Sequence, residues 1–152
     1  MRISAKTDYA VRAAAELAAA PEGETVKAER ISTAQNIPHN FLENILSEMR
    51  HAGIVQSRRG PEGGFLLARP AAEISIADII RAIDGPLAGV SGERPQNLEY
   101  VGPAAPLQGV WVAVRASLRT VLERVSLADL ASGSLPEHVR KMIADEDAWV
   151  TH

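Results

Sequence analysis

The stretch NIPHNFLENIL, residues 36–46, decides the fold of this chain. Periodic apolar residues predict a short helix over about 27–35 and a second helix over about 38–51, which ends before a glycine. Asn36 tolerates the left-handed backbone that ends one helix, and Pro38 suits the start of the next. Two helices joined by so short a turn form a helix-turn-helix. We expect these residues to face inward: Ala28, Ile31 and Ala34, then Phe41, Leu42, Ile45, Leu46 and Met49.

An alanine-rich stretch precedes this pair and a glycine-rich one follows it. Residues 6–20 predict a first helix with Ser4 as its N-cap. Short apolar runs at 54–57 and 65–68 predict two strands, joined through the basic sequence RRGPEGG at 58–64. Taken alone, such a connection is an ordinary loop. Directly after a helix-turn-helix, it is predicted to be a wing.

The rest of the chain predicts a packing helix, a long loop and a long helix. Ser75 caps the first of these, whose isoleucines share one face. Residues 87–105 lose all periodicity, and loops of this length are usually functional or disordered. The helix over 107–125 repeats apolar residues at spacings of 4 and 3, which indicates dimerisation, with packing inside the chain as the alternative. Its seam consists of Leu107, Trp111, Val114, Leu118, Val121 and Val125.

The predicted fold class is mainly α with a small β-hairpin wing, a winged helix-turn-helix domain followed by a long C-terminal dimerisation helix. We divide the chain into a winged domain over 1–85, a sensor-like loop over 86–105, the dimerisation helix with a short capped helix over 106–131, and a charged tail over 132–152.

Composition narrows the function classes. The 152 residues, 46% hydrophobic and 23% charged, predict one compact folded domain with an extension. With no cysteine, the chain has no disulfide, thiolate metal site or cysteine nucleophile, and its four histidines lack paired spacing. We therefore expect no metal and no cofactor. No nucleophile–base pair, carboxylate dyad or phosphate-binding motif is present, so we do not predict an enzyme. The lack of a long apolar run or signal peptide predicts a cytoplasmic protein with no membrane partner.

Net charge neither excludes nor establishes binding to nucleic acid. The chain carries a formal charge of -3, but residues 1–70 hold nine basic and eight acidic side chains, against seven and eleven in 71–152. This asymmetry is mild and is also compatible with ordinary surface variation. DNA binding must therefore depend on where particular basic residues lie.

The order of these elements resembles the Rrf-two superfamily of winged helix-turn-helix transcription regulators, which includes the IscR, NsrR and CymR types. The likeness covers nearly the whole chain apart from 87–105 and the last twenty or so residues. Its most specific part is the wing string. The stretches that carry it are YAVRA at 9–13, IPHNFLENIL at 37–46, RGPEGGFLLA at 59–68, IADIIRAIDG at 76–85, Trp111, and SLADL at 126–130.

This resemblance implies a homodimer on a roughly two-fold symmetric operator of double-stranded DNA, usually as a repressor and sometimes as an activator. It implies major-groove reading from Pro38, Asn40 and Glu43, and minor-groove entry by Arg59 and Gly60. A Glu43 carboxylate can accept from a cytosine amino group, and an arginine is drawn to a narrow minor groove. Pro38 lacks the hydroxyl of the serine in some relatives. The full predicted set of DNA contacts is Pro38, His39, Asn40, Glu43, Asn44, Arg58, Arg59 and Gly60.

The loop departs from several of these relatives, which hold an iron-sulfur cluster there with three cysteines and a histidine or an N-terminal acid. In this chain Ala105 stands near the position of the last cysteine ligand and Gln108 near that of the histidine ligand. Asp8 stands where one branch of the family supplies the acid ligand. An acid without thiolates does not hold a cluster. We expect a cluster-free regulator that responds to an unknown small molecule or protein at loop 87–105. The alternative is a protein-interaction module whose winged domain or loop docks a partner.

Overall fold

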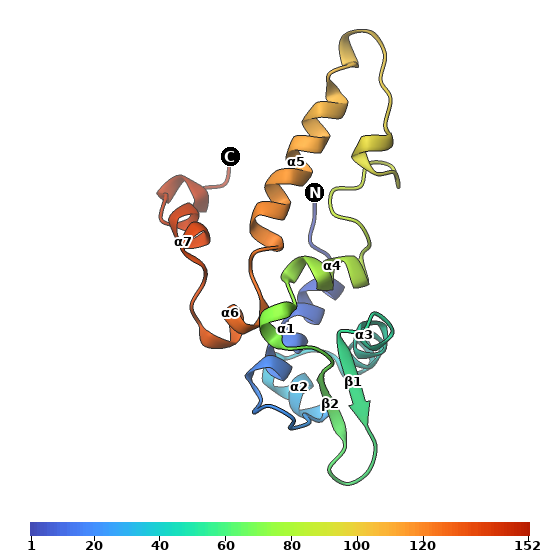
Figure 1. Ribbon diagram of the computed structural model, residues 1–152, viewed down its shortest axis with the longest axis vertical. Helices are drawn as coiled ribbons and strands as arrows, with labels where there is room; N and C mark the ends of the chain where they lie inside the picture. The colour runs from blue at the N-terminus through green and yellow to red at the C-terminus, as the bar shows by residue number, and fades with distance from the viewer.

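The structure, a computed structural model, describes residues 1–152 and consists mainly of helices. Its N-terminal half forms a rounded body that contains three helices and one hairpin (Figure 1). The two strands pair antiparallel with Val55 opposite Leu67 and Arg58 opposite Gly64. In chain order these elements are α1 (Ala5–Ala19), α2 (Ala28–Gln35), α3 (His39–His51), β1 (Val55–Arg58) and β2 (Gly64–Leu67).

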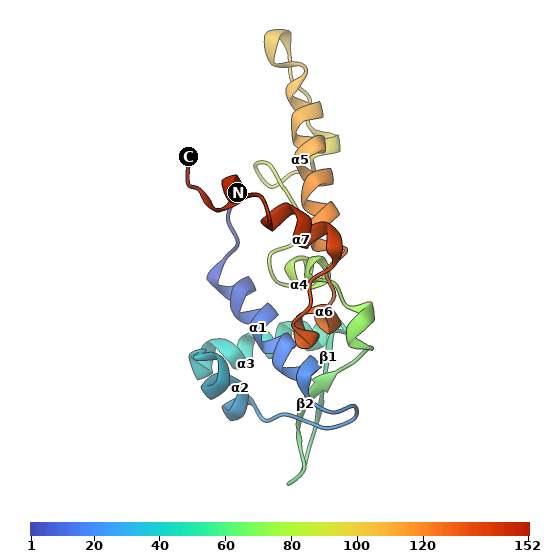
Figure 2. The same ribbon diagram turned by 90° about the vertical axis from the view of Figure 1, so that its left-hand side faces the viewer.

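The second half returns to this body and then leaves it. Helix α5 projects from the body; the loop before it runs outward to the tip, and α5 runs back from the tip to the body (Figures 1 and 2). Two short 3-10 turns, Pro95–Asn97 and Gly102–Ala104, interrupt that loop. The helices are α4 (Ile76–Ile83), α5 (Leu107–Leu122), α6 (Leu127–Ser132) and α7 (Glu137–Ile143), followed by a 3-10 turn at Glu146–Trp149. No helix has both the length and the apolarity to cross a membrane.

Helix α1 lies at the centre of the main core. Three of its alanines, Ala10, Ala13 and Ala14, expose no surface, and α2, α3, α4 and α6 all contact this helix. Because alanine has so short a side chain, neighbouring helices can approach α1 closely without leaving voids. The predicted α1 and its Ser4 cap are confirmed, with the helix starting and ending one residue earlier than expected.

The long helix is shorter than predicted and ends at Leu122. A capping box formed by Ser126 and Asp129 begins α6 only a few residues later, which leaves Val125 outside both helices. Val125 is 5% exposed, and its carbonyl accepts a hydrogen bond from the backbone N–H of Ile76 at 3.0 Å. The assignment of Val125 to a dimer seam is therefore wrong, because this side chain is buried within its own chain.

Helix α6 packs with the winged body, although the sequence division placed it with the long helix. Leu127 is fully buried in the main core beside α1, and its N–H donates to the carbonyl of Ile74 at 2.9 Å. Ser75 and Ser126 form an antiparallel bridge between the starts of α4 and α6. The chain leaves the body through the loop after α4, returns through α5, and is attached to the body again at the base of that helix (Figure 1).

Two smaller expectations are also corrected. Ala34 is exposed near the end of α2, although it lies only three residues from the buried Ile31, because no other element covers this part of the helix. The tail after residue 132 contains structure that its composition did not indicate. Helix α7 lies against α5, with Val139 buried and the ring Nε2 of His138 3.1 Å from the carbonyl oxygen of Thr120.

A charged cluster joins α5 to α4 near the base of the projection. Glu123 accepts hydrogen bonds from Arg119 on α5 and from Arg81 on α4. These bonds, the one from Arg119 first, hold the pKa of the Glu123 carboxyl below its ordinary value of 4.5. A carboxyl with a lowered pKa in the folded state stabilises that state above its ordinary pKa, and the stabilisation is lost as the pH falls through the lowered value.

We predict that Glu123→Gln lowers the free energy of unfolding at pH 7 and that its difference from the wild type shrinks as the pH falls below 4.5. Urea denaturation at several pH values measures this. Glu137→Gln is the matched control, because Glu137 forms only a local, exposed ion pair with Lys141. A difference that stays constant from pH 7 to acid contradicts the assigned role.

Candidate nucleic-acid interface

The turn between α2 and α3 is fixed by its backbone. Asn36 adopts the left-handed conformation with φ 51° and ψ 50°, as its residue type predicts. The N–H of Ile37 donates to the carbonyl of Ser32 at 3.0 Å, and the Ser32 hydroxyl donates to the carbonyl of Ile37 at 2.6 Å. With Ile37 buried just after the turn, the direction in which α3 leaves is set.

Helix α3 buries one face and leaves the other polar. Leu42, Ile45, Leu46 and Met49 expose no surface. Pro38 is the N-cap rather than the first helical residue. The predicted contacts Pro38, His39, Asn40, Glu43 and Asn44 are all exposed at the start of this helix.

Phe41 departs from its predicted place in the core, since 58% of it is exposed. It lies at the edge of the buried stripe, where it lines a shallow cleft with Tyr9 of α1 and Asn44. The four fully buried side chains of α3 already fill the space between this helix and the rest of the body. Phe41, the fifth apolar side chain of the helix, therefore remains exposed. Its position beside Asn44 puts an aromatic ring next to the exposed polar face.

The wing is held to the segment before α2. The N–H of Val26 donates to the carbonyl of Phe65 at 2.8 Å, and the Thr25 hydroxyl donates to the carbonyl of Glu62 at 2.7 Å. A Cβ at Gly64 would lie 2.7 Å from the Val26 carbonyl oxygen. Only glycine permits so close an approach of two backbone segments.

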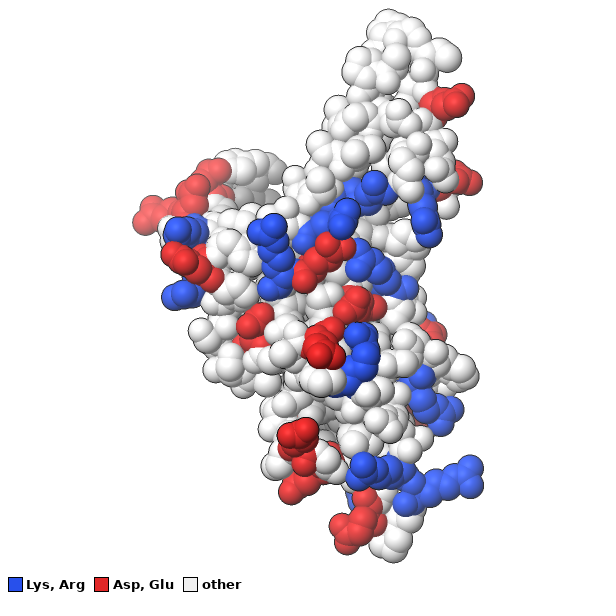
Figure 3. Space-filling model, viewed as in Figure 1, with Lys and Arg blue, Asp and Glu red and all other residues white.

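The two wing arginines differ in their environment. Arg58 donates to the carbonyl of Gly23 at 3.0 Å, so the chain itself holds this guanidinium. Arg59 and Gly60 are exposed at the start of the turn, and Arg59 has no hydrogen-bond or ion-pair partner in the chain. In the view of Figure 3, basic side chains project from one side of the hairpin with acidic side chains close by, more basic side chains lie over the middle of the molecule, and the tip of α5 is almost uncharged.

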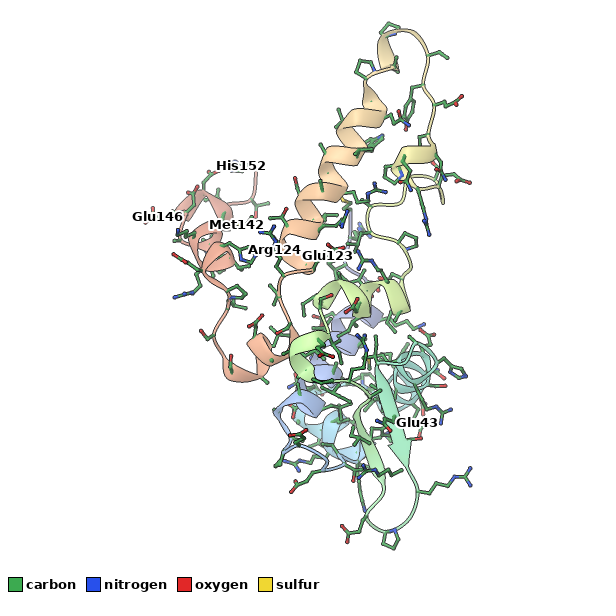
Figure 4. The ribbon with its side chains drawn as sticks, in the orientation of Figure 1. Glu43, Glu123, Arg124, Met142, Glu146 and His152 are labelled. Carbon is green, nitrogen blue, oxygen red and sulfur yellow. The ribbon has the colours of Figure 1, made fainter.

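The end of α3 contacts the first strand of the wing hairpin. Arg50 at the end of α3 reaches the Ser57 hydroxyl of β1 at 3.4 Å, and Figure 4 shows Glu43 beside this α3–β1 edge. The Nε2 of His39 lies 3.1 Å from a carboxylate oxygen of Glu43 one turn along α3. The structure thus links α3 to the wing at the end of the helix, while the predicted helix contacts lie toward its start and Arg59 and Gly60 lie in the hairpin turn.

One positioning residue was missed by the sequence reasoning. Arg12 on α1 donates to the carbonyl of Gln35 at the end of α2 at 2.7 Å and lies over the Tyr9 ring. It also pairs with Asp8 at 3.0 Å, so Asp8 is engaged within its own helix. Arg12 occurs in the YAVRA stretch, but no local sequence pattern predicts that its side chain contacts the end of α2.

Known proteins with the same arrangement establish the family. The sequence profile described as Rrf2, iron-dependent transcriptional regulator, matches residues 3–133. The chain belongs to the Rrf2 family. It is 52% identical over 145 residues to the Mycobacterium tuberculosis H37Rv protein Rv1287, a candidate HTH-type transcriptional regulator, a match that covers 95% of this chain and 90% of that protein.

Solved structures of Rrf2 proteins share the fold. The structure of CymR, described as the global cysteine regulator of B. subtilis, has a TM-score of 0.75 and 33% identity, covering 88% of this chain and 98% of that one. T. potens IscR has a TM-score of 0.68 and 28% identity, covering 100% and 93%. The chain is thus a DNA-binding transcriptional regulator of the winged helix-turn-helix class, and its named relatives are regulators, not enzymes.

The residues of this Rrf2 chain do not fit an iron-sulfur cluster. It has no cysteine, and no three of its histidine and acidic side chains come together in a way that could hold a metal ion. Ala105 just precedes α5, Gln108 lies in its first turn, and Asp8 pairs with Arg12. Iron in such clusters needs thiolate ligands. The words "iron-dependent" in the family description therefore do not imply an iron-sulfur cluster in this chain.

We predict that Asn36→Val destabilises the protein by about 1–3 kcal/mol, because a β-branched residue is strained in the left-handed conformation. Asn36→Gly removes the same side chain and should leave stability within about 1 kcal/mol of the wild type. Urea denaturation followed by circular dichroism measures both. Equal destabilisation by valine and glycine would show that the Asn36 side chain, not its backbone, fixes the turn.

Proposed function

We propose that this Rrf2 protein is a homodimeric repressor that binds a two-fold symmetric DNA operator through α3 and the wing of each protomer. The carrying observation is that the start of α3 is exposed and polar, and that the end of the same helix contacts β1 of the hairpin that carries the unpaired Arg59. A recognition helix enters the major groove in this motif, and a basic wing reaches the adjacent backbone or minor groove. Repression follows where such an operator overlaps a promoter.

Each residue at this edge has a separate chemical role in the proposal. Glu43 accepts from a cytosine amino group, while Asn40 donates or accepts at a base or phosphate. Arg59 enters a narrow minor groove, where its charge is attracted to both strands. Arg58, already bound to the carbonyl of Gly23, shapes the wing and adds charge. His39 holds Glu43 in place before DNA arrives.

Helix α5 supplies the proposed dimer contact. None of its 16 residues is buried in the single chain, although it carries a strip of apolar side chains. A second copy of the same helix covers such a strip in a self-complementary, two-fold interface. Five of the six predicted seam residues remain in this proposal: Leu107, Trp111, Val114, Leu118 and Val121.

Loop 87–105 is the proposed place for an effector, either a small molecule or a protein. A cavity of about 680 Å³ lies between the start of this loop, the end of α4 and the base of α5. Leu87, Leu118 and Leu122 line it, together with Asp84. Asp84 accepts hydrogen bonds from Ser4 at 2.7 Å and Thr7 at 2.6 Å on α1, so a bound molecule would contact the centre of the winged body.

We predict different effects for Arg59→Ala and Glu43→Ala on an operator selected from random DNA by the purified protein. Arg59→Ala should weaken binding and make the slope of log affinity against log salt shallower by about 0.9 for each phosphate that the arginine neutralises. Glu43→Ala should cost about 1–3 kcal/mol and relax the preference at one base pair. Fluorescence anisotropy over a salt series measures both effects.

Arg140→Ala is the control for charge, because Arg140 is exposed on α7, which contacts α5 rather than the wing. Unchanged operator affinity in both Arg59→Ala and Glu43→Ala would remove these residues from the DNA contact. It would then favour the protein-interaction alternative for this surface.

We predict that Val114→Asp raises the dimer dissociation constant at least tenfold, because a charged side chain buried in an apolar seam loses its hydration. Ala116→Asp is the matched control, because Ala116 is exposed on the opposite side of α5. Sedimentation equilibrium measures both. Equal dimer stability in the two variants would place the interface elsewhere.

A further inference from the structure

The loop before α5 is held against that helix by three side-chain hydrogen bonds. The Gln108 amide donates to the backbone carbonyl of Gln96 at 3.1 Å. The Arg115 guanidinium donates to the side-chain oxygen of the same Gln96. Between these two donors on α5, the Trp111 indole N–H donates to the Tyr100 hydroxyl at 3.1 Å. We call these five residues the loop clasp.

Gln96 is the centre of the clasp because it uses both of its oxygens. It lies in the 3-10 turn Pro95–Asn97, and Pro95 is buried beside it. Its two donors are seven residues apart on α5, so one glutamine bridges two turns of the helix. A loop that lacks an apolar core of its own thereby obtains a defined position.

The clasp occupies one face of α5. Gln108, Trp111 and Arg115 follow one another at helical spacing and turn toward the loop. On the other flank, α7 contacts α5 at Thr120 through His138. Between these two flanks lies an apolar strip that contains the exposed Val110 and the half-buried seam residues Val114 and Val121, with the seam residue Trp111 at its edge beside the loop. The position of the loop therefore decides which face of α5 a second copy can meet.

We infer that Gln96 and Tyr100 are positioning residues that hold loop 95–105 on α5 and so shape the dimer seam without any cofactor. The inference rests on the proposed dimer through α5. Sequence resemblance places a cluster histidine near Gln108, and in this chain the Gln108 side chain ties down the loop instead. The clasp thus makes the loop position independent of iron.

Gln96→Ala removes the bond from Arg115 and keeps the backbone carbonyl that Gln108 contacts; Asn97→Ala is its matched control. Asn97 is an exposed amide in the same turn, and its side chain makes no hydrogen bond within the chain. Quenching of Trp111 fluorescence by acrylamide, in a Trp149→Phe background, reports the loop directly. Sedimentation equilibrium reports the dimer. Tyr100→Phe removes only the hydroxyl that Trp111 contacts.

We expect Gln96→Ala and Tyr100→Phe to increase quenching of Trp111 and to raise the dimer dissociation constant about fivefold, as for the net loss of one hydrogen bond. Asn97→Ala should change neither. Operator affinity of the wild type should be the same after anaerobic purification with iron and after chelation.

Each part of the inference has its own contradicting result. Unchanged Trp111 quenching in both Gln96→Ala and Tyr100→Phe overturns the clasp, whatever the oligomeric state. Increased quenching with an unchanged dimer, in a protein that Val114→Asp does dissociate, overturns its role in the seam. An unchanged dimer in Val114→Asp instead contradicts the proposed function. Operator binding that is abolished by chelation overturns independence from iron.

Discussion

The close packing of other helices against α1 is the constraint on which the rest of the structure depends. Ala10, Ala13 and Ala14 are fully buried and have short side chains. Both α3 and α6 can therefore pack closely against α1. Any larger side chain at these positions would push α3 outward, because a packed interior has no room for added methylenes. Placement of the DNA-binding helix thus begins with residues that carry no chemistry.

The connection between the two halves depends on backbone pairing as well as on packing. Ser75 and Ser126 bridge the starts of α4 and α6, and Glu123 ties the end of α5 to Arg81 of α4 (Figure 4). The projecting helix is therefore attached to the body only at its base. A movement of α5 or its loop would reach α1 through Asp84 and Thr7, which gives an effector at the loop a physical route to the DNA-binding half.

The DNA-binding half and the projecting half differ in how their positions are held. Around α3, buried side chains and a left-handed turn leave one arrangement. Along α5, half-buried residues and surface hydrogen bonds hold the loop with less burial. Since exposed hydrogen bonds contribute little net free energy each, the second region is the one whose shape a ligand or partner copy can change.

Much of the winged half was determined by the sequence alone. The turn at Asn36, the caps at Ser4, Ser75 and Ser126, and the hairpin all depend on local backbone preferences that each residue type carries with it. The lack of thiolate ligands also follows from the sequence alone, because the chain has no cysteine. The exposed starts of α3 and the wing were also predicted by the residues themselves.

Only the tertiary structure decided which apolar side chains lie inside. Helical spacing places Phe41 and Val125 on apolar stripes, yet Phe41 remains exposed and Val125 is buried away from the seam. The contact of Arg12 with α2 and the bonds of Gln96 join residues 12 to 23 positions apart. Periodicity describes one helix at a time, whereas burial and such contacts depend on what the rest of the chain brings alongside it.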